Sequence, residues 1–425
     1  MKITELHQHF LNSKGVSTDT REDLKDKLFF ALKGENFNGN KFVLKAIKEG
    51  AKLAITDDVS LENHPQLICV DDVLKCLQSL AKYHRQYLEI PILAITGSNG
   101  KTTTKELVAA VLSKKYKVDF TLGNLNNHIG VPLTLLKMDE TTEFGVVEMG
   151  ANHQKEIEFL CEIAQPDFGY VTNFGKAHLE GFGGFEGVIK GKSELYNYLK
   201  KENKQIFINT DDEIQVKQSE GGALIKMSNA TTSNCQVELI STNPFVEVKF
   251  KDVFIKTHLL GSYNLKNITA AICVGKHFEV EEAEIQTAIA NYKPDNNRSQ
   301  IIELESNQFI LDAYNANPTS MELAVKNFKG FPAKYKVVLL GDMFEVGTSA
   351  LKEHQNIVDL LEDLAFDEAY VCGKIFGETE VSKTQKFIDF KKLEKVLKQK
   401  KYENTTFLIK GSRGMKMERV LDLFK

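Results

Sequence analysis

The chain of 425 residues is long for one domain, and its 42% hydrophobic and 26% charged residues are ordinary for a globular protein with sizeable cores. Asp and Glu (58) outnumber Lys and Arg (54), and the net charge of −4 argues against a nucleic-acid binder, which needs a basic excess. The first residues have no apolar signal segment, no apolar run approaches the ~20 residues that cross a bilayer, and the six scattered cysteines suit a reducing compartment, so we expect a cytoplasmic protein without membrane insertion.

Residues 1–88 are predicted to form a small α/β domain, because apolar runs alternate with helix-like spacing along this segment. The expected strands are Leu28–Leu32, Ala51–Thr56 and Gln66–Val70, and the expected helices are Lys41–Gly50 and Asp71–Tyr87. Pro91 marks the boundary with the next domain.

Residues 89–297 are predicted to form a central doubly wound domain, in which strands and helices alternate and apolar strands form a parallel sheet covered on both faces. The expected strands are Ile92–Thr96, Phe144–Met149, Phe168–Thr172 and Ile206–Asn209. Residues 219–260 have Thr, Ser and Asn clusters between short β-prone runs such as Val246–Phe250. We therefore expect an antiparallel excursion there.

Residues 298–425 are predicted to form a third, smaller α/β domain. The Pro- and Asn-rich stretch Tyr292–Arg298 is typical of a hinge between domains. Beyond it, the expected strands are Phe309–Asp312, Val337–Gly341, Glu368–Cys372 and Phe407–Lys410, which alternate with helices.

A phosphate-binding loop is the strongest functional signal. The strand Ile92–Thr96 leads into a turn with Gly97 and Gly100, whose backbone N–H groups can point inward at the start of a helix. Lys101 then supplies a charge for the β- and γ-phosphates, and the Thr102 hydroxyl can bind Mg²⁺. The turn is shorter than the usual phosphate loop. An ordinary strand-to-helix turn remains the less favoured alternative, so we expect a nucleoside triphosphate to bind here.

Two side chains at the carboxyl ends of neighbouring strands are candidate ligands. Glu148 ends an apolar strand at the edge where ligands bind in open α/β sheets, and it suits Mg²⁺. His178 follows the next strand and is a candidate metal or phosphate ligand, although a lone histidine is more often structural. Lys192 is an unremarkable surface lysine by spacing alone.

Two polar segments are open to two interpretations each. Gly123–Pro132, which is dense in Asn, could cap a helix or line a polar substrate site. Asp312–Pro318 follows a strand of the third domain, and it could place Asp and Asn side chains on a ribose or adenine, or simply turn the chain.

Taken together, these segments resemble the Mur ligase family over nearly the whole chain. The short phosphate loop of that family, Thr-Gly-x-Asn-Gly-Lys-Thr, matches Thr96–Thr102. The resemblance implies an N-terminal domain for a UDP-linked substrate, a central ATP-binding domain with a P-loop, and a Rossmann-like third domain that closes over ATP and binds the second substrate. It implies catalytic roles for Lys101, Glu148, His178 and Lys192.

The resemblance also assigns ligands. Nucleotide contacts are implied for Gly97, Ser98, Asn99, Gly100, Lys101, Thr102, Thr103, Asn264, Asn267, Arg298, Asp312 and Asn315. Mg²⁺ ligands are implied at Thr102, Glu148, His178 and Lys192, with Lys192 carbamylated. Substrate contacts are implied for Thr18, Thr20, Arg21, Lys33, Asn126, Asn127, Lys410, Ser412 and Arg413. The family's Asp-Ser-Arg is Asp19–Arg21 here with Thr20 in the middle, and its Asp-Gly-His is replaced at Asn38–Asn40.

Within the family, the segments Asn126–Thr134, Asp312–Pro318 and Leu340–Glu345 are similar to those of the members that join D-alanyl-D-alanine to UDP-N-acetylmuramoyl-tripeptide. The resemblance thus implies an ATP- and Mg²⁺-dependent amide ligase that works through an acyl phosphate, as a monomer, in the last cytoplasmic step of peptidoglycan precursor synthesis. The alternatives are another amide ligase on the same scaffold, a P-loop switch or motor, and a silent nucleotide-binding scaffold.

Overall fold

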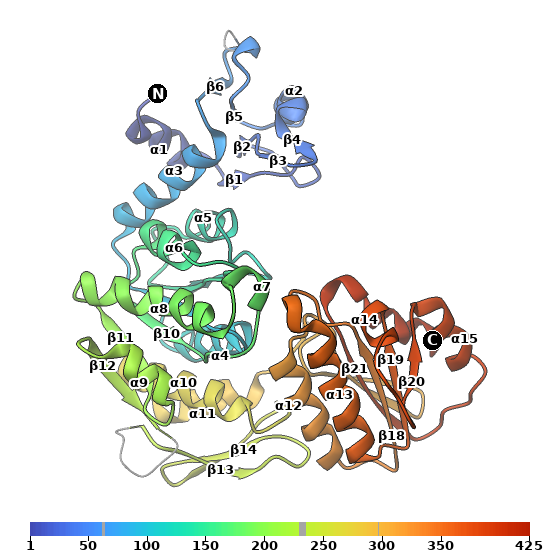
Figure 1. The fold of residues 1–425 in the computed structure, drawn as a ribbon. Coiled ribbons are helices and arrows are strands. Elements are labelled where there is room, and N and C mark those ends of the chain that lie inside the picture. Colours follow the sequence, from blue (N-terminus) through green and yellow to red (C-terminus); the bar gives the residue numbers. More distant parts are fainter. Residues whose placement is uncertain (62–63, 229–234, 296) are drawn as a thin grey trace.

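The computed structural model describes residues 1–61, 64–228, 235–295 and 297–425. Three α/β units follow one another along the chain, each built around its own sheet (Figure 1). This architecture confirms the predicted fold class. Within the described ranges, no helix is both long and apolar enough to span a membrane.

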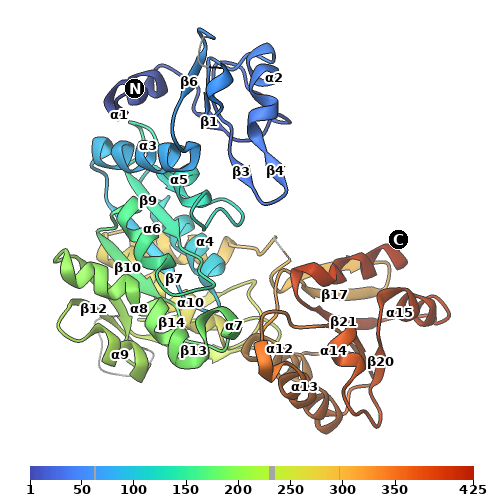
Figure 2. The same ribbon diagram turned by 45° about the horizontal axis from the view of Figure 1, so that its top comes forward.

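The N-terminal unit has a parallel sheet in the order β1-β2-β5-β6. A small antiparallel hairpin, β3–β4, projects from it (Figure 2). The strands are β1 (Val16–Ser17), β2 (Leu28–Phe30), β3 (Lys33–Gly34), β4 (Phe37–Asn38), β5 (Leu53–Thr56) and β6 (Leu67–Cys69). The helices are α1 (Ile3–Leu11), η1 (Gly39–Phe42), α2 (Val43–Lys48) and η2 (Val59–Leu61).

Helix α3 (Val73–Leu88) joins this unit to the central one. Its N-cap is Asp72, whose carboxylate accepts a hydrogen bond from the Lys75 N–H. The helix packs against α1 on one side and against α5 and α6 of the central unit on the other. Its buried Arg85 donates to the carbonyl of Ala164 and, at 2.8 Å, to Asp167. The last helix of the predicted first domain is therefore anchored on the second.

The central sheet has the order β12-β11-β10-β7-β9-β8, and all neighbouring strands are parallel. The strands are β7 (Ile92–Thr96), β8 (Val118–Phe120), β9 (Phe144–Glu148), β10 (Phe168–Val171), β11 (Gln205–Asn209) and β12 (Ala223–Met227). The helices are α4 (Lys101–Leu112), α5 (Gly130–Leu135), α6 (Glu156–Ala164), α7 (Leu179–Phe182), α8 (Phe185–Lys201), α9 (Glu213–Ser219), α10 (Asn264–His277) and α11 (Glu282–Asn291).

Strand β7 shows why this sheet needs helices on both faces. Each of its residues is buried. Ile92 and Ala94 belong to the core formed with α5, α6 and α8, whereas Leu93 and Ile95 belong to the core formed with α4, α10 and α11. The alternation of a strand thus places successive side chains in opposite cores.

The stretch predicted as an antiparallel excursion is only partly one. β13 (Val237–Ser241), β14 (Glu247–Phe250) and β15 (Val253–Lys256) form a separate antiparallel sheet, as expected. β12, from the same stretch, instead extends the central sheet in parallel with β11, because the intervening α9 returns the chain to the same edge. Residues 229–234 of the excursion and Asn296 of the predicted hinge lie outside the described residues.

The third unit has a sheet in the order β16-β17-β21-β18-β19-β20, parallel except for the edge strand β16. Helices α12 and α13 share one core with this sheet, and α15 and η5 share the other. The strands are β16 (Gln300–Leu304), β17 (Asn307–Asp312), β18 (Tyr335–Gly341), β19 (Glu368–Cys372), β20 (Gln385–Phe387) and β21 (Thr405–Lys410). The helices are α12 (Pro318–Gly330), η3 (Gly347–Ser349), α13 (Ala350–Leu364), α14 (Lys374–Gly377), α15 (Phe390–Leu397), η4 (Arg413–Met415) and η5 (Met417–Leu423).

Candidate active site

A cavity of about 870 Å³ lies where the carboxyl ends of the central strands meet the third unit. Ligands of open α/β sheets bind at this edge. Of the residues predicted from the sequence, the cavity is lined by Ser98, Asn99, Gly100, Lys101, Thr102, Thr103, Asn126, Asn127, Glu148, His178, Asn264, Asn267, Arg298, Asp312, Asn315 and Lys410.

The phosphate loop between β7 and α4 requires its two glycines. Gly97 has φ +140°, and a Cβ there would lie 2.0 Å from the Thr172 hydroxyl oxygen. Gly100 has φ +80°, and a Cβ there would lie 2.6 Å from Asn267 Oδ1. Side chains other than hydrogen would therefore be both strained and obstructed at these positions.

Lys101 begins α4 and folds back over its own loop. Its Nζ donates to the carbonyls of Gly97 at 2.7 Å and Ser98 at 3.3 Å. Burial lowers the pKa of Lys101 to about 8; Glu148 opposes this shift and the Arg298 cation adds to it. Two cations close together at a helix N-terminus form a site that favours an anion.

A chain of amides fastens α10 to the phosphate-loop helix. The Thr104 hydroxyl donates to Asn267 Oδ1 at 3.0 Å, Asn267 Nδ2 donates to Asn264 Oδ1 at 2.7 Å, and Asn264 Nδ2 donates to the Leu260 carbonyl at 2.7 Å. Because the two asparagines hydrogen-bond to each other and to Thr104 of α4, they hold α10 against α4. They therefore position the cavity wall that they also line.

Glu148 ends β9 and is 1% exposed. Its Oε1 accepts a hydrogen bond from Asn126 Nδ2 at 2.8 Å, while Oε2 has no hydrogen-bond partner among the described residues. Asn126 is itself held against Gly150, where a Cβ would lie 2.8 Å from its Oδ1. Asn126, predicted as a substrate ligand, therefore orients a carboxylate that could hold a cation.

Lys105 is a further charged group at this carboxylate. It is completely buried, and its Nζ lies 3.7 Å from Glu148 Oε2 and 3.7 Å from Glu106 Oε1. The ammonium also lies 5.7 Å from the centre of the Phe120 ring. A buried lysine that faces a strand-end carboxylate strongly affects the electrostatics of the site, because burial deprives both groups of the solvation that would screen their charges.

Lys192 on α8 lies just behind the cavity and is 1% exposed. Its Nζ donates to the carbonyl of Ala151, a residue of the lining, at 3.1 Å and sits 5.0 Å above the Phe182 ring. Burial holds the pKa of Lys192 well below its usual range, and the Lys101 cation lowers it further. The spacing of the sequence suggests a surface lysine here, and that interpretation is wrong.

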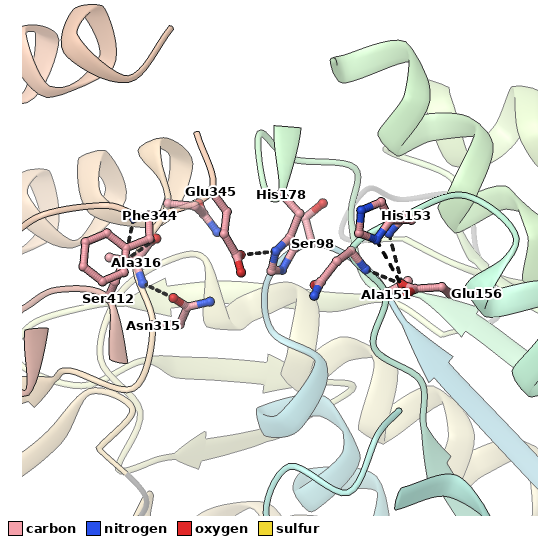
Figure 3. A network of polar contacts seen from close by, with 12 residues as sticks. Ser98, Ala151, His153, Glu156, His178, Asn315, Ala316, Phe344, Glu345 and Ser412 are labelled. Carbon is pink, nitrogen blue, oxygen red and sulfur yellow. Dashed lines mark hydrogen bonds and ion pairs between the residues drawn. The ribbon is translucent and has the colours of Figure 1, made fainter. Parts of the chain in front are cut away.

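His178 precedes α7 with φ +52°, a left-handed conformation that is uncommon outside glycine. Its Nδ1 is ion-paired with Glu345 from the loop after β18, so this histidine faces the third unit (Figure 3). The pairing lowers the pKa of the Glu345 carboxyl. In the described part of the chain, no group of three or more His, Cys, Asp or Glu side chains is placed to hold a metal ion.

The third unit contributes an arginine stacked on a tyrosine. The Arg298 guanidinium lies 3.8 Å from the centre of the Tyr314 ring, and both line the cavity. Asp312 accepts from Lys410 at 2.6 Å, and Lys410 also donates to the Asn315 carbonyl at 3.2 Å. Two cations and one carboxylate of this unit therefore face the phosphate loop.

Several predicted residues lie away from the cavity. Ser412 is buried, and its hydroxyl accepts from the Phe344 N–H at 2.8 Å (Figure 3), while the exposed Arg413 pairs with Glu418. In the N-terminal unit, Arg21 pairs with Asp19, and Lys33 lies 2.8 Å from Asp57. None of the residues Thr18, Thr20, Arg21, Lys33, Gly97, Lys192, Ser412 and Arg413 is part of the lining.

The loop after β10 and the phosphate loop touch the third unit directly. Lys176 pairs with Glu353 at 3.0 Å, and its N–H reaches the Thr319 hydroxyl at 3.3 Å. Asn317 Nδ2 donates to Asn99 Oδ1 at 2.7 Å. The two halves of the cavity are thus joined by polar contacts across the interface.

Lys105, Tyr314, Asn317 and Glu345 were not predicted from the sequence as site residues. Tyr314 and Asn317 stand in the polar segment Asp312–Pro318, and Glu345 ends a segment that resembles the family, so their neighbours supplied a signal. No nearby residue indicated a role for Lys105, because a lysine in the second turn of a helix is ordinarily exposed.

Two family models and a curated relative match most of the chain. Residues 95–275 match the model of the Mur ligase middle domain, and residues 297–413 match that of the Mur ligase, glutamate ligase domain. The UDP-N-acetylmuramoyl-tripeptide–D-alanyl-D-alanine ligase of Bacillus subtilis is 34% identical over 96% of this chain and 92% of its own length.

Solved structures extend the likeness to the arrangement of the units. MurF from Acinetobacter baumannii superposes with a TM-score of 0.87 at 28% identity, covering 100% of this chain and 98% of the other. MurF ligase from Thermotoga maritima in complex with ADP superposes with a TM-score of 0.85 at 27% identity, covering 97% of each chain.

Proposed function

This chain belongs to the Mur ligase family, and we propose that it catalyses the ATP-dependent addition of D-alanyl-D-alanine to UDP-N-acetylmuramoyl-tripeptide in peptidoglycan precursor synthesis. The observation that carries the proposal is the cavity of about 870 Å³ between the phosphate loop and the third unit. It is large enough for a nucleotide and reacting groups, and it is lined by cations from both sides. Full-length similarity to ligases of this name supplies the substrates.

ATP is proposed to bind along the phosphate loop, residues 97–103. The backbone N–H groups at the start of α4 and the Lys101 ammonium suit its phosphates. Asn264, Asn267, Arg298, Asp312 and Asn315 are proposed to bind the nucleotide from α10 and from the third unit. Their support is their place on the cavity wall, and Arg298 also brings its charge close to Lys101.

The donor set fits Mg²⁺, a cation that prefers oxygen ligands. Thr102 offers a hydroxyl at the start of α4, and Glu148 offers a buried Oε2 that has no hydrogen-bond partner among the described residues. We propose these two as ligands, together with His178 after it leaves Glu345. The bound ion would neutralise phosphate charge during transfer.

Lys192 is proposed to act as a carbamate. Its depressed pKa favours the neutral amine, which is the form that adds to carbon dioxide. Carbamylation replaces a buried amine, which would repel Lys101 if it were protonated, by an anion with two oxygens that can bind a hard cation.

The reaction is proposed to begin when the terminal carboxylate of the tripeptide attacks the γ-phosphorus, forming an acyl phosphate and ADP. The amine of D-alanyl-D-alanine then attacks the acyl carbon, and the tetrahedral intermediate collapses with release of phosphate. Lys101 and Arg298 stabilise negative charge, which is what phosphoryl transfer chiefly needs. Contacts such as Lys176–Glu353 join the third unit to the central unit, and closure of the two over the cavity would exclude water from the acyl phosphate.

The remaining roles are proposed by position. Thr18, Thr20, Arg21 and Lys33 of the N-terminal unit would bind the uridine nucleotide, and Asn126 and Asn127 would face the peptide part. Lys410, Ser412 and Arg413 of the third unit would receive the dipeptide. One chain carries every one of these residues, so a monomer suffices. The structure describes all six cysteines and shows no disulfide among them, and this and the use of ATP suit the cytoplasm.

Phosphate release from ATP in the presence of Mg²⁺ tests this function. The purified protein is given UDP-N-acetylmuramoyl-tripeptide alone, D-alanyl-D-alanine alone, and both together. Sustained release that needs both substrates supports the ligase. Release with neither substrate would instead identify a P-loop switch or motor, and the substrate assignment would be abandoned.

A further inference from the structure

Asn317 links the third unit to the phosphate loop through both ends of one amide. It is the N-cap of α12, where its Oδ1 accepts a hydrogen bond from the Ser320 N–H at 2.9 Å. Its Nδ2 donates to Asn99 Oδ1 at 2.7 Å. The same side chain therefore caps a helix of one unit and contacts the nucleotide loop of another.

The helix cap dictates how the Asn99 amide is turned. A backbone N–H can only donate, so Asn317 must present its oxygen to Ser320 and its NH₂ to Asn99. Asn99 must then present its oxygen to Asn317, and its own NH₂ is directed elsewhere. The orientation of an amide in the phosphate loop is thus set by a residue of the third unit.

The backbone of Asn99 is fixed by the central unit, whereas one end of its side-chain amide has no protein partner within the described ranges. Its backbone is held by the central unit, since its N–H donates to Asn173 Oδ1 at 3.1 Å and its carbonyl accepts from the Thr172 hydroxyl at 2.6 Å. Its Nδ2 is buried beside Gly175 and has no hydrogen-bond partner among the described residues. Asn99 and Gly175 both line the cavity, so this donor stands in the wall of the nucleotide site.

We propose that Asn317 is a positioning residue for phosphoryl transfer: by donating to Asn99 Oδ1, it holds Asn99 Nδ2 toward an oxygen of the γ-phosphoryl group of ATP. The inference rests on the proposed function. Asn99 is the loop residue that touches the unit proposed to bring the incoming amine, and the group being transferred must lie between the loop and that unit. A donor beside Lys101 matches a phosphate oxygen.

The consequence is that the nucleotide site is complete only when the third unit is docked. Without Asn317, the Asn99 amide can rotate or offer its oxygen to the phosphate, which is repulsive. The Asn317 contact therefore adds one oriented donor at the transferred group, which ADP lacks.

Two substitutions separate this role from helix capping. Asn317→Ser keeps an N-cap oxygen, but its side chain is too short to reach Asn99. Asn317→Asp keeps the cap with a carboxylate and replaces the donor by an acceptor. Asp389→Ser, at the N-cap of α15, is the matched control because it makes the same kind of change in the same unit.

Isothermal titration with ADP and with the non-hydrolysable ATP analogue AMP-PNP, both with Mg²⁺, measures the effect. We expect both Asn317 variants to bind AMP-PNP about 3- to 10-fold more weakly, as loss of one hydrogen bond implies, with ADP affinity unchanged. kcat should fall in both variants, and Asp389→Ser should match the wild type in every measurement.

Equal losses for ADP and AMP-PNP, or no loss for either, would overturn the inference. So would a loss in Asn317→Ser that Asn317→Asp does not share, because capping would then be the cause. The proposed function fails separately, through a wild-type protein that does not ligate; an active wild type with unchanged Asn317 variants contradicts the positioning role alone.

Discussion

Replacing Lys105 by methionine tests the electrostatics beneath the proposed metal site. Methionine nearly preserves the length of the side chain and removes the charge, which leaves Glu148 as a buried anion without its cation. At the 3.7 Å that separates Lys105 Nζ from Glu148 Oε2, an effective dielectric constant of about 20 gives an attraction of about 4–5 kcal/mol. Part of this is offset, because the variant no longer buries an ammonium, and a net loss of about 2–4 kcal/mol is expected.

The assay must report on the central unit, because unfolding of a protein with several units is not a single transition. Native-state hydrogen exchange, followed by mass spectrometry on peptides from α4 and β9, gives the opening free energy of this region without metal or nucleotide. Lys105→Met should lower it by about 2–4 kcal/mol. The double variant Lys105→Met/Glu148→Gln should recover at least half of the loss, since position 148 then no longer carries a buried charge without its cation.

If Lys105→Met lowered the opening free energy by less than about 1 kcal/mol, the Lys105–Glu148 pair would be no stronger than a surface ion pair, and its proposed electrostatic role would be wrong. A double variant as unstable as Lys105→Met would also refute it, because packing rather than charge would be responsible.

Three further predictions concern other groups. Lys101→Ala should reduce ligation at least about 100-fold in kcat, as loss of a charged contact to the transition state does, and near-normal phosphate release would contradict its role. Isotopically labelled bicarbonate should give a carbamate signal in the NMR spectrum that is absent in Lys192→Arg; an identical signal in both would remove Lys192 as the carbamylation site. Burial and the neighbouring His84 lower the pKa of His7 from 6.5 to about 4. Between these two pH values, the unfolded chain therefore binds a proton at His7 that the folded chain does not bind. The free energy of unfolding is therefore not reduced by His7 above pH 6.5, and it declines as the pH falls from 6.5 toward 4. His7→Phe should flatten this part of the plot of unfolding free energy against pH. An unchanged plot would contradict the assignment.

The phosphate loop could be predicted because its signals are local. Strand β7 has the predicted bounds Ile92–Thr96, and α4 begins at Lys101 as expected. The positive φ of Gly97 and Gly100 follows from the residue type. Glu148 was recognised for the same reason, since a carboxylate at the end of an apolar strand has its position set by the strand alone.

Features that depend on distant segments could not be predicted. Lys105 is buried because β9 brings Glu148 to the face of α4, and nothing near Lys105 in the sequence indicates this. The strand bounds of the third unit were predicted closely, yet the contact between Glu345 and His178 depends on how that unit docks. β12 was assigned to the antiparallel excursion because it lies within residues 219–260, where Thr, Ser and Asn clusters separate short β-prone runs, whereas its pairing is decided by the edge left open by β11.

In the proposed reaction, this chain activates the tripeptide carboxylate as an acyl phosphate and transfers the acyl group to D-alanyl-D-alanine. Tripeptide substrate with a heavy-oxygen label in that carboxylate, incubated with ATP, Mg²⁺ and the dipeptide, tests it most directly by mass spectrometry of the phosphate and the UDP product. We expect one labelled oxygen in the released phosphate and a product heavier by one dipeptide. Unlabelled phosphate, or phosphate released without the dipeptide product, would contradict it.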